Sequence, residues 1–98
     1  MDIYITIIEA VPDCSNPERE QYAGAYINCW VRAKSEQDAI SRAMEYIDSE
    51  HWRCIQLEEI SVAERSRYAD LPDSLACFDA ACEQGIAALF HIWLNESV

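Results

Sequence analysis

Two side chains in this sequence, His91 and Arg32, have the chemistry that acid–base catalysis on a small molecule requires. Histidine has an ordinary pKa close to neutrality, so it can both accept and donate a proton. Arginine stays charged and binds anions such as carboxylates. An enzyme built on this pair would use His91 as the acid–base group and Arg32 as the anchor for an anionic substrate. A structural His91 that only hydrogen-bonds to a neighbour is the interpretation we favour.

Metal binding and cysteine chemistry have weaker support. His51 and Cys54 form an H-x-x-C pair, but neither a second such pair nor a C-x-x-C is present, and a zinc site needs four ligands. Cys29 alternates with apolar residues, so we expect a small core residue. Cys14 lies in a polar segment and needs a basic partner to become reactive, and only Arg19 is near in sequence. We predict no metal and no cofactor, and leave the role of Cys14 open.

The segment GAYINCWVRA, residues 24–33, has two unlike faces when read as a strand. Its odd-numbered residues suit a core, while its even-numbered residues are large rings and hydrogen-bonding groups. His91 and Trp93 have the same character in the last apolar segment, IAALFHIWL. Aromatic residues and arginine are enriched at the centres of binding interfaces. The predicted interaction face consists of Tyr26, Asn28, Trp30, Arg32, His91 and Trp93.

Three arrangements would account for such a face. The loops at 12–21 and 64–73 could cover part of it. A second copy of the chain could pack on it, giving a homodimer. A pocket over the sheet could also bind a small planar ligand, and a dimer can enclose such a pocket between its sheets. Homodimerisation is the arrangement we expect, with ligand binding compatible with it.

Alternating apolar residues and turn signals predict the order strand, strand, helix, strand, helix, strand. The elements are expected, in chain order, near 3–8, 22–33, 36–50, 53–63, 73–84 and 86–94. Ser35 is the expected N-cap of the first helix, Asp73 or Ser74 is the expected cap of the second, and Gly85 is expected to end the second. A β-bulge near Glu58 and Glu59 would turn the apolar residues of the third strand, Ile55 included, to one side.

Each predicted helix has one narrow apolar stripe, so each is expected to be covered on one side only. Two helices on one face of a four-stranded sheet satisfy that pattern, as an α+β two-layer sandwich in a single domain over residues 1–98. This β-β-α-β-α-β architecture resembles the ferredoxin-like plait or a permuted relative. The interaction face would then be the helix-free side of the sheet, with Trp30 and Trp93 emerging together on it.

The chain is strongly acidic, with a formal net charge of −11 over 98 residues. Such a charge disfavours phosphate backbones and anionic membranes, so we expect neither nucleic acid nor membrane as a partner. The chain has no apolar run long enough to span a bilayer and lacks the basic start of a signal peptide, which indicates a cytoplasmic protein with reduced cysteines.

These observations predict a small acidic soluble domain that acts through binding and not through catalysis. The alternatives are a small-molecule enzyme with a sheet-lined cavity and His91 as acid–base group, and a protein that binds a basic partner. An acidic immunity-type inhibitor of a basic toxin is the specific form of the second alternative. It would make its contact through the acidic helix at 36–50 and would lose affinity steeply with salt.

Overall fold

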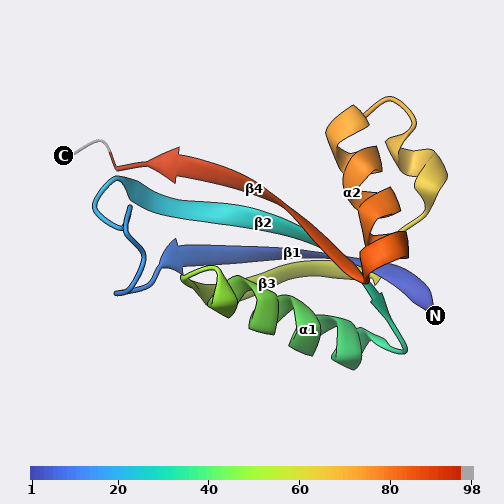
Figure 1. The fold of residues 1–98 in the computed structure, drawn as a ribbon, viewed down its shortest axis with the longest axis horizontal. Coiled ribbons are helices and arrows are strands. Elements are labelled where there is room, and N and C mark those ends of the chain that lie inside the picture. Colours follow the sequence, from blue (N-terminus) through green and yellow to red (C-terminus); the bar gives the residue numbers. More distant parts are fainter. Residues whose placement is uncertain (96–98) are drawn as a thin grey trace.

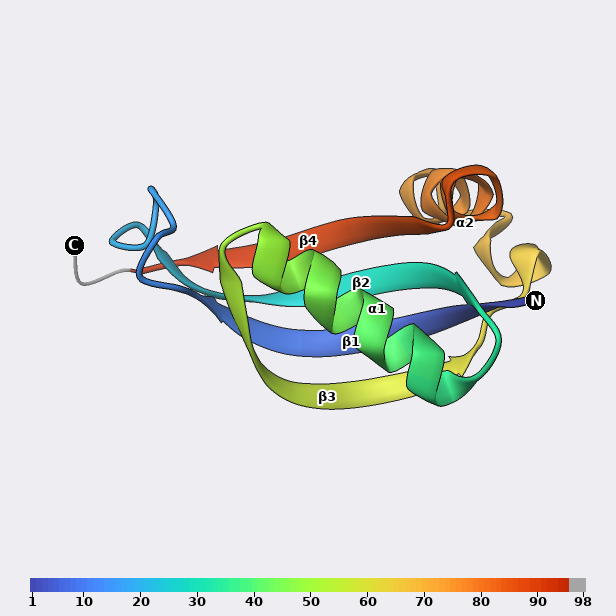
Figure 2. The ribbon, with the colours of Figure 1, turned by 60° about the horizontal axis from the view of Figure 1, so that its bottom comes forward.

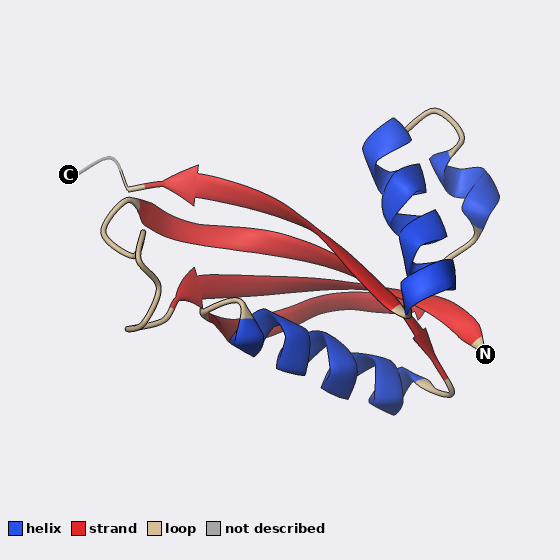
Figure 3. Ribbon diagram, in the orientation of Figure 1, coloured by secondary structure: helices blue, strands red, loops and turns tan. Residues whose placement is uncertain are grey.

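The computed structural model describes residues 1–95 and has the predicted order of elements (Figures 1 and 3). The elements are β1 (Asp2–Pro12), β2 (Tyr22–Ala33), α1 (Glu36–Ser49), β3 (Trp52–Val62), the 3₁₀ helix η1 (Arg65–Tyr68), α2 (Pro72–Gln84) and β4 (Ile86–Leu94). The strands form one antiparallel sheet in the order β3-β1-β2-β4. The α+β fold class is therefore confirmed.

The helix α1 covers one face of the sheet, where it packs against β1, β2 and β3. Its start is fixed by the predicted cap, since the Ser35 hydroxyl accepts a hydrogen bond of 3.2 Å from the Asp38 amide. Ala39, Ala43 and Ile47 lie on one stripe at helical spacing and are fully buried. They pack on the face of β2 that carries its odd-numbered residues from Ala25 to Ala33.

The helix α2 packs on the opposite face, together with η1 (Figures 1 and 2). Phe78 and Ala81 of α2 and Tyr68 of η1 form one buried cluster with Trp30 and Ile5. Trp30 lies on the opposite side of β2 from the residues beneath α1, because neighbouring strand residues point to opposite faces. The expectation that both helices lie on one face is therefore wrong, and this arrangement also differs from the ferredoxin-like plait.

The physical reason for this correction lies in β1. Its residues Ile3, Ile5 and Ile7 point to the α2 face, while Tyr4 and Ile8 point to the α1 face. Both faces of β1 are therefore apolar, as in strands that are buried on both sides. A helix with one apolar stripe must cover something, but the stripe does not say which face of the sheet it covers.

The two ends of α2 are held in different ways. Leu71 is the N-cap and gives no side-chain cap, with Pro72 starting the helix, so the predicted capping by Asp73 or Ser74 is wrong. Gly85 ends the helix at φ 98°, as predicted, in a left-handed conformation that glycine adopts readily.

The short helix η1 is tied to α2 by a forked contact. Arg65 donates to the two carboxylate oxygens of Asp79 at 2.9 and 3.1 Å. The hydrogen bonds from Arg65 lower the pKa of Asp79. This contact helps to keep η1 and α2 together over Trp30.

The edge strand β3 contains two interruptions of its pairing with β1. One lies between the pairs Ile7–Glu59 and Ile8–Leu57, which leaves Glu58 as the extra residue and confirms the predicted bulge. The second leaves Ile55 unpaired. Ile55 is half exposed, and it does not pack against the core beneath α1 as Leu57 and Ile60 of the same strand do. Within residues 1–95, neither α helix is long and apolar enough to cross a membrane.

Candidate interaction surface

The α2 face of the sheet is covered at one end only, and this divides the residues predicted to form the interaction face. Figures 1 and 3 show η1 and α2 over the end of the sheet near the N-terminus, with no helix over the far ends of β2 and β4 on this side. Trp30 lies at the covered end and is 1% exposed. Its ring meets Tyr68 edge to face, with centroids 5.7 Å apart. Trp30 is therefore a core residue and not a surface residue.

Arg32 also lies at the covered end. Its guanidinium donates to the Cys82 carbonyl at 2.6 Å, in the last turn of α2, where the helix dipole favours a cation. His91 is paired with Tyr26, which is six positions from Arg32 along β2 (32 − 26). Since a strand rises about 3.3 Å per residue, the two backbones are separated by roughly 20 Å. The structure therefore does not bring the proposed acid–base group and anion anchor into one site.

Tyr26, His91 and Trp93 come together at the uncovered end, and we call these three residues the open patch. The rings of Tyr26 and Trp93 are 5.3 Å apart at an interplanar angle of 49°. The two side chains are nevertheless 43% and 40% exposed, and His91 beside them is exposed as well. The Trp93 indole lies directly over Gly24, where an added Cβ would come within 2.5 Å of Trp93 Cζ2. The missing side chain at Gly24 is what lets the indole lie flat on the sheet.

A cavity of about 320 Å³ lies where the covered end meets the open end. Its lining residues are Ile5, Ile7, Asn28, Trp30, Glu59, Arg67, Tyr68, Leu71 and Ser74. Among residues 1–95, the buried Trp30 Nε1 has no hydrogen-bond partner, and Glu59 and Arg67 form no ion pair. The cavity thus combines an apolar floor with charges of both signs, which suits a small molecule with a polar end. Of the predicted face, it includes Asn28 and Trp30.

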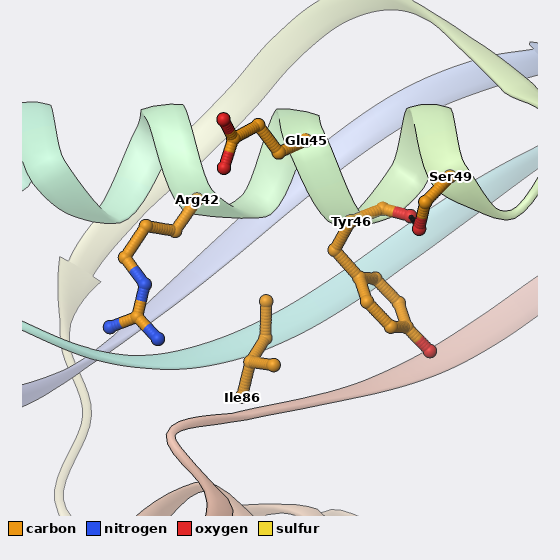
Figure 4. Close-up of a pocket in the computed structure, with 5 residues that line it drawn as sticks. All are labelled: Arg42, Glu45, Tyr46, Ser49 and Ile86. Carbon is orange, nitrogen blue, oxygen red and sulfur yellow. Dashed lines mark hydrogen bonds between the residues drawn. The ribbon is translucent and has the colours of Figure 1, made fainter.

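A second cavity, of about 310 Å³, lies on the other face of the sheet between α1 and β4 (Figure 4). Four α1 residues line it opposite Ile86 of β4: Arg42, Glu45, Tyr46 and Ser49. Two of its polar side chains bond to the backbone, since Arg42 donates to the Arg32 carbonyl and Ser49 donates to the Tyr46 carbonyl. The pKa of Tyr46 is raised to about 12, mainly because the side chain is partly buried and secondly because the negative charge of Glu50 lies nearby. The cavity is a gap that α1 leaves beside β4.

Within the described residues 1–95, the cysteines do not form an assembled reactive or metal-binding site. Cys29 is fully buried, and burial raises the pKa of its thiol to about 12, so it stays protonated at neutral pH. Cys14 and Cys82 are exposed. Within residues 1–95, no three histidine, cysteine, aspartate or glutamate side chains gather in a way that could hold a metal ion.

The least expected feature is the strand β4. Every residue of β4 except His91 is apolar, a pattern typical of a buried strand, yet not one of its nine residues is buried. Ile86, Ala88 and Phe90 are half-buried against the core beneath α1, while Ile92, Trp93 and Leu94 are exposed. The local sequence carries no signal for this, because the lack of cover depends on where the two helices lie.

The fold and surface therefore define a small α+β protein with an exposed aromatic patch and an apolar edge strand whose second half is exposed. Comparison with known proteins adds no function, since no family model, no curated protein and no solved structure matches this chain.

Proposed function

We propose that this protein is a non-catalytic interaction module that associates with a second copy of itself through the open patch and the neighbouring end of β4. The observation that carries the proposal is the contact of Tyr26 and Trp93, two large rings that pack on each other while remaining about 40% exposed. Tyrosine and tryptophan are the residues most often found to dominate binding energy at protein interfaces. Exposed aromatic surface of this kind marks an interaction site.

The charge distribution supports a second copy as the partner. Each copy carries a net charge of −11, so contact between two copies is most favourable where acidic side chains are absent. No charged residue occurs between Gln21 and Val31 or between Gln84 and Asn95. These two segments contain most of β2 and all of β4, which pair with each other. The open patch therefore lies on two neighbouring strand segments that carry no charge, and Glu9 of β1, which pairs with Tyr26, is a carboxylate beside it on the same face.

The catalytic alternative lacks an assembled site, because Arg32 serves the end of α2 while His91 lies in the open patch. A basic partner is compatible with the acidic surface, and binding to such a partner would weaken as the salt concentration rises.

Molar mass in solution tests the proposal, measured by light scattering over a range of protein concentrations. We expect the unmodified protein to reach twice the mass of one chain. Trp93→Ala should weaken the association at least about tenfold, as expected for loss of an interface anchor. Met44→Ala is the matched control, because Met44 is 39% exposed but lies on α1. A protein that stays monomeric at every concentration, or associates equally well without Trp93, would contradict the proposal.

A further inference from the structure

Among the residues that the structure describes, the strand β4 pairs with β2 alone, which leaves its other edge free. The Arg32 amide donates to the Gly85 carbonyl at 2.9 Å. This hydrogen bond shows which residues of β4 direct their backbone groups toward β2. In an antiparallel pair, residues alternate between bonding to the partner strand and pointing away from it. The backbone groups that point away from β2 therefore belong to Ile86, Ala88, Phe90 and Ile92.

Only the second half of this edge is open. The Ala88 carbonyl accepts a weak hydrogen bond from the Cys77 thiol of α2 at 3.8 Å, so α2 shields the first half. Within residues 1–95, no hydrogen bond reaches the outward backbone groups of Phe90 and Ile92. An exposed row of such groups is a template for another strand.

The side chains at this end of β4 are exposed on both faces of the sheet. Ile92 is 39% exposed on the α1 face, and Trp93 is 40% exposed on the α2 face. A strand added at the free edge would contact both side chains at once, whereas a sheet stacked on one face would reach only one of them. Stacking on the α2 face would also bring Glu9 and Glu59, which point to that face, against their copies.

We infer that two copies join edge to edge through β4, in antiparallel orientation, so that their sheets become one continuous sheet. This inference rests on the proposed self-association and specifies its geometry. If only the free backbone groups of Phe90 and Ile92 take part in the pairing, the two-fold axis passes next to His91. Phe90 of each copy then forms hydrogen bonds with Ile92 of the other. Both His91 side chains then lie side by side, with Tyr26 and Trp93 of each copy flanking them.

A proline substitution on each edge of the sheet tests this geometry. Ile92→Pro removes an outward amide from β4, and an outward amide on an edge strand is a position where proline is tolerated. Val62→Pro is the matched control, because Val62 is also exposed and its amide points outward from β3. Ile92→Ala separates the loss of the side chain from the loss of the amide. Circular dichroism checks that each variant is folded.

We expect Ile92→Pro to weaken association at least a hundredfold, Ile92→Ala to weaken it about tenfold or less, and Val62→Pro to leave it unchanged. If Ile92→Pro still associates normally while Trp93→Ala does not, edge pairing is overturned and the open patch survives as the interface. If the unmodified protein never associates, both proposals fail together.

A measurement on the unmodified sequence covers the case in which Ile92→Pro does not fold. In a mixture of isotope-labelled and unlabelled chains, NMR should detect contact between the His91 Hα atoms of two copies, which lie close together in this register. A saturated dimer that lacks this contact would overturn the register, and a dimer without any contact between the two β4 strands would overturn edge pairing.

Discussion

The two edges of the sheet are built in opposite ways. The β3 edge carries Arg53, Glu58 and Glu59 and is interrupted by two bulges. The β4 edge has no charged residue and pairs with β2 in regular register from Ile86 to Trp93. Charges and bulges are the usual devices that prevent a strand edge from pairing with another molecule.

The difference shows that the β3 edge is protected against pairing with another strand, whereas the β4 edge has no charge or bulge that would prevent such pairing. The open second half of the β4 edge is apolar and has neither charges nor bulges, and such an edge is a hazard in a monomer. In a symmetric dimer the same edge becomes interior, and both copies are protected by one contact. In the proposed dimer, β3 ends the sheet and β4 continues it into a second copy.

The largest expected effect on the free energy of unfolding comes from a substitution in the buried core between the two edges of the sheet. Trp30→Ala should lower the free energy of unfolding by about 3–5 kcal/mol, because it empties a fully buried site beneath η1 and α2. Val62→Ala on the β3 edge should change it by about 1 kcal/mol or less. Urea denaturation at a concentration that keeps the chain monomeric measures both. A loss below 1 kcal/mol for Trp30→Ala would mean that the covered end is not part of the core.

A smaller effect is expected from salt on the affinity of one copy for another, and it tests whether the contact lies on the uncharged edge of β4. Two chains that each carry −11 repel one another, and salt shortens the range of this repulsion from about 10 Å at 0.1 M to about 3 Å at 1 M. Association through the uncharged edge should therefore tighten by a few-fold as sodium chloride rises, measured by sedimentation equilibrium. Weakening with salt would indicate a contact between opposite charges, as in binding to a basic partner.

The sequence was sufficient to predict the elements of the fold because its local signals are strong. The sequence predicts the β-rich run of β1, the alternation of β2, the Ser35 cap, the Gly85 end of α2 and the extra residue at Glu58. The side of the sheet taken by α2 was not predicted. The run from Ile3 to Ile8, which is apolar except at Thr6, is the signal that could have revealed cover on both faces, since a strand with one solvated face alternates between apolar and polar residues.

The site was harder to predict, because Trp30 and Trp93 share one face and one chemistry but have opposite surroundings. Their parity in the strands correctly places both indoles on the same side. Only the position of α2 along the sheet makes Trp30 a core residue and leaves Trp93 exposed. That position depends on long-range packing of Phe78 and Tyr68, which no local pattern encodes.

Amide hydrogen exchange compares the two edges most directly. The outward amides of Phe90 and Ile92 on β4 and of Ile60 and Val62 on β3 are followed at low and high protein concentration. We predict that exchange at Phe90 and Ile92 slows as concentration rises, while exchange at Ile60 and Val62 stays fast throughout. If all four amides exchange equally fast at concentrations where the protein is fully associated, β4 does not pair with a second copy and the central claim is wrong.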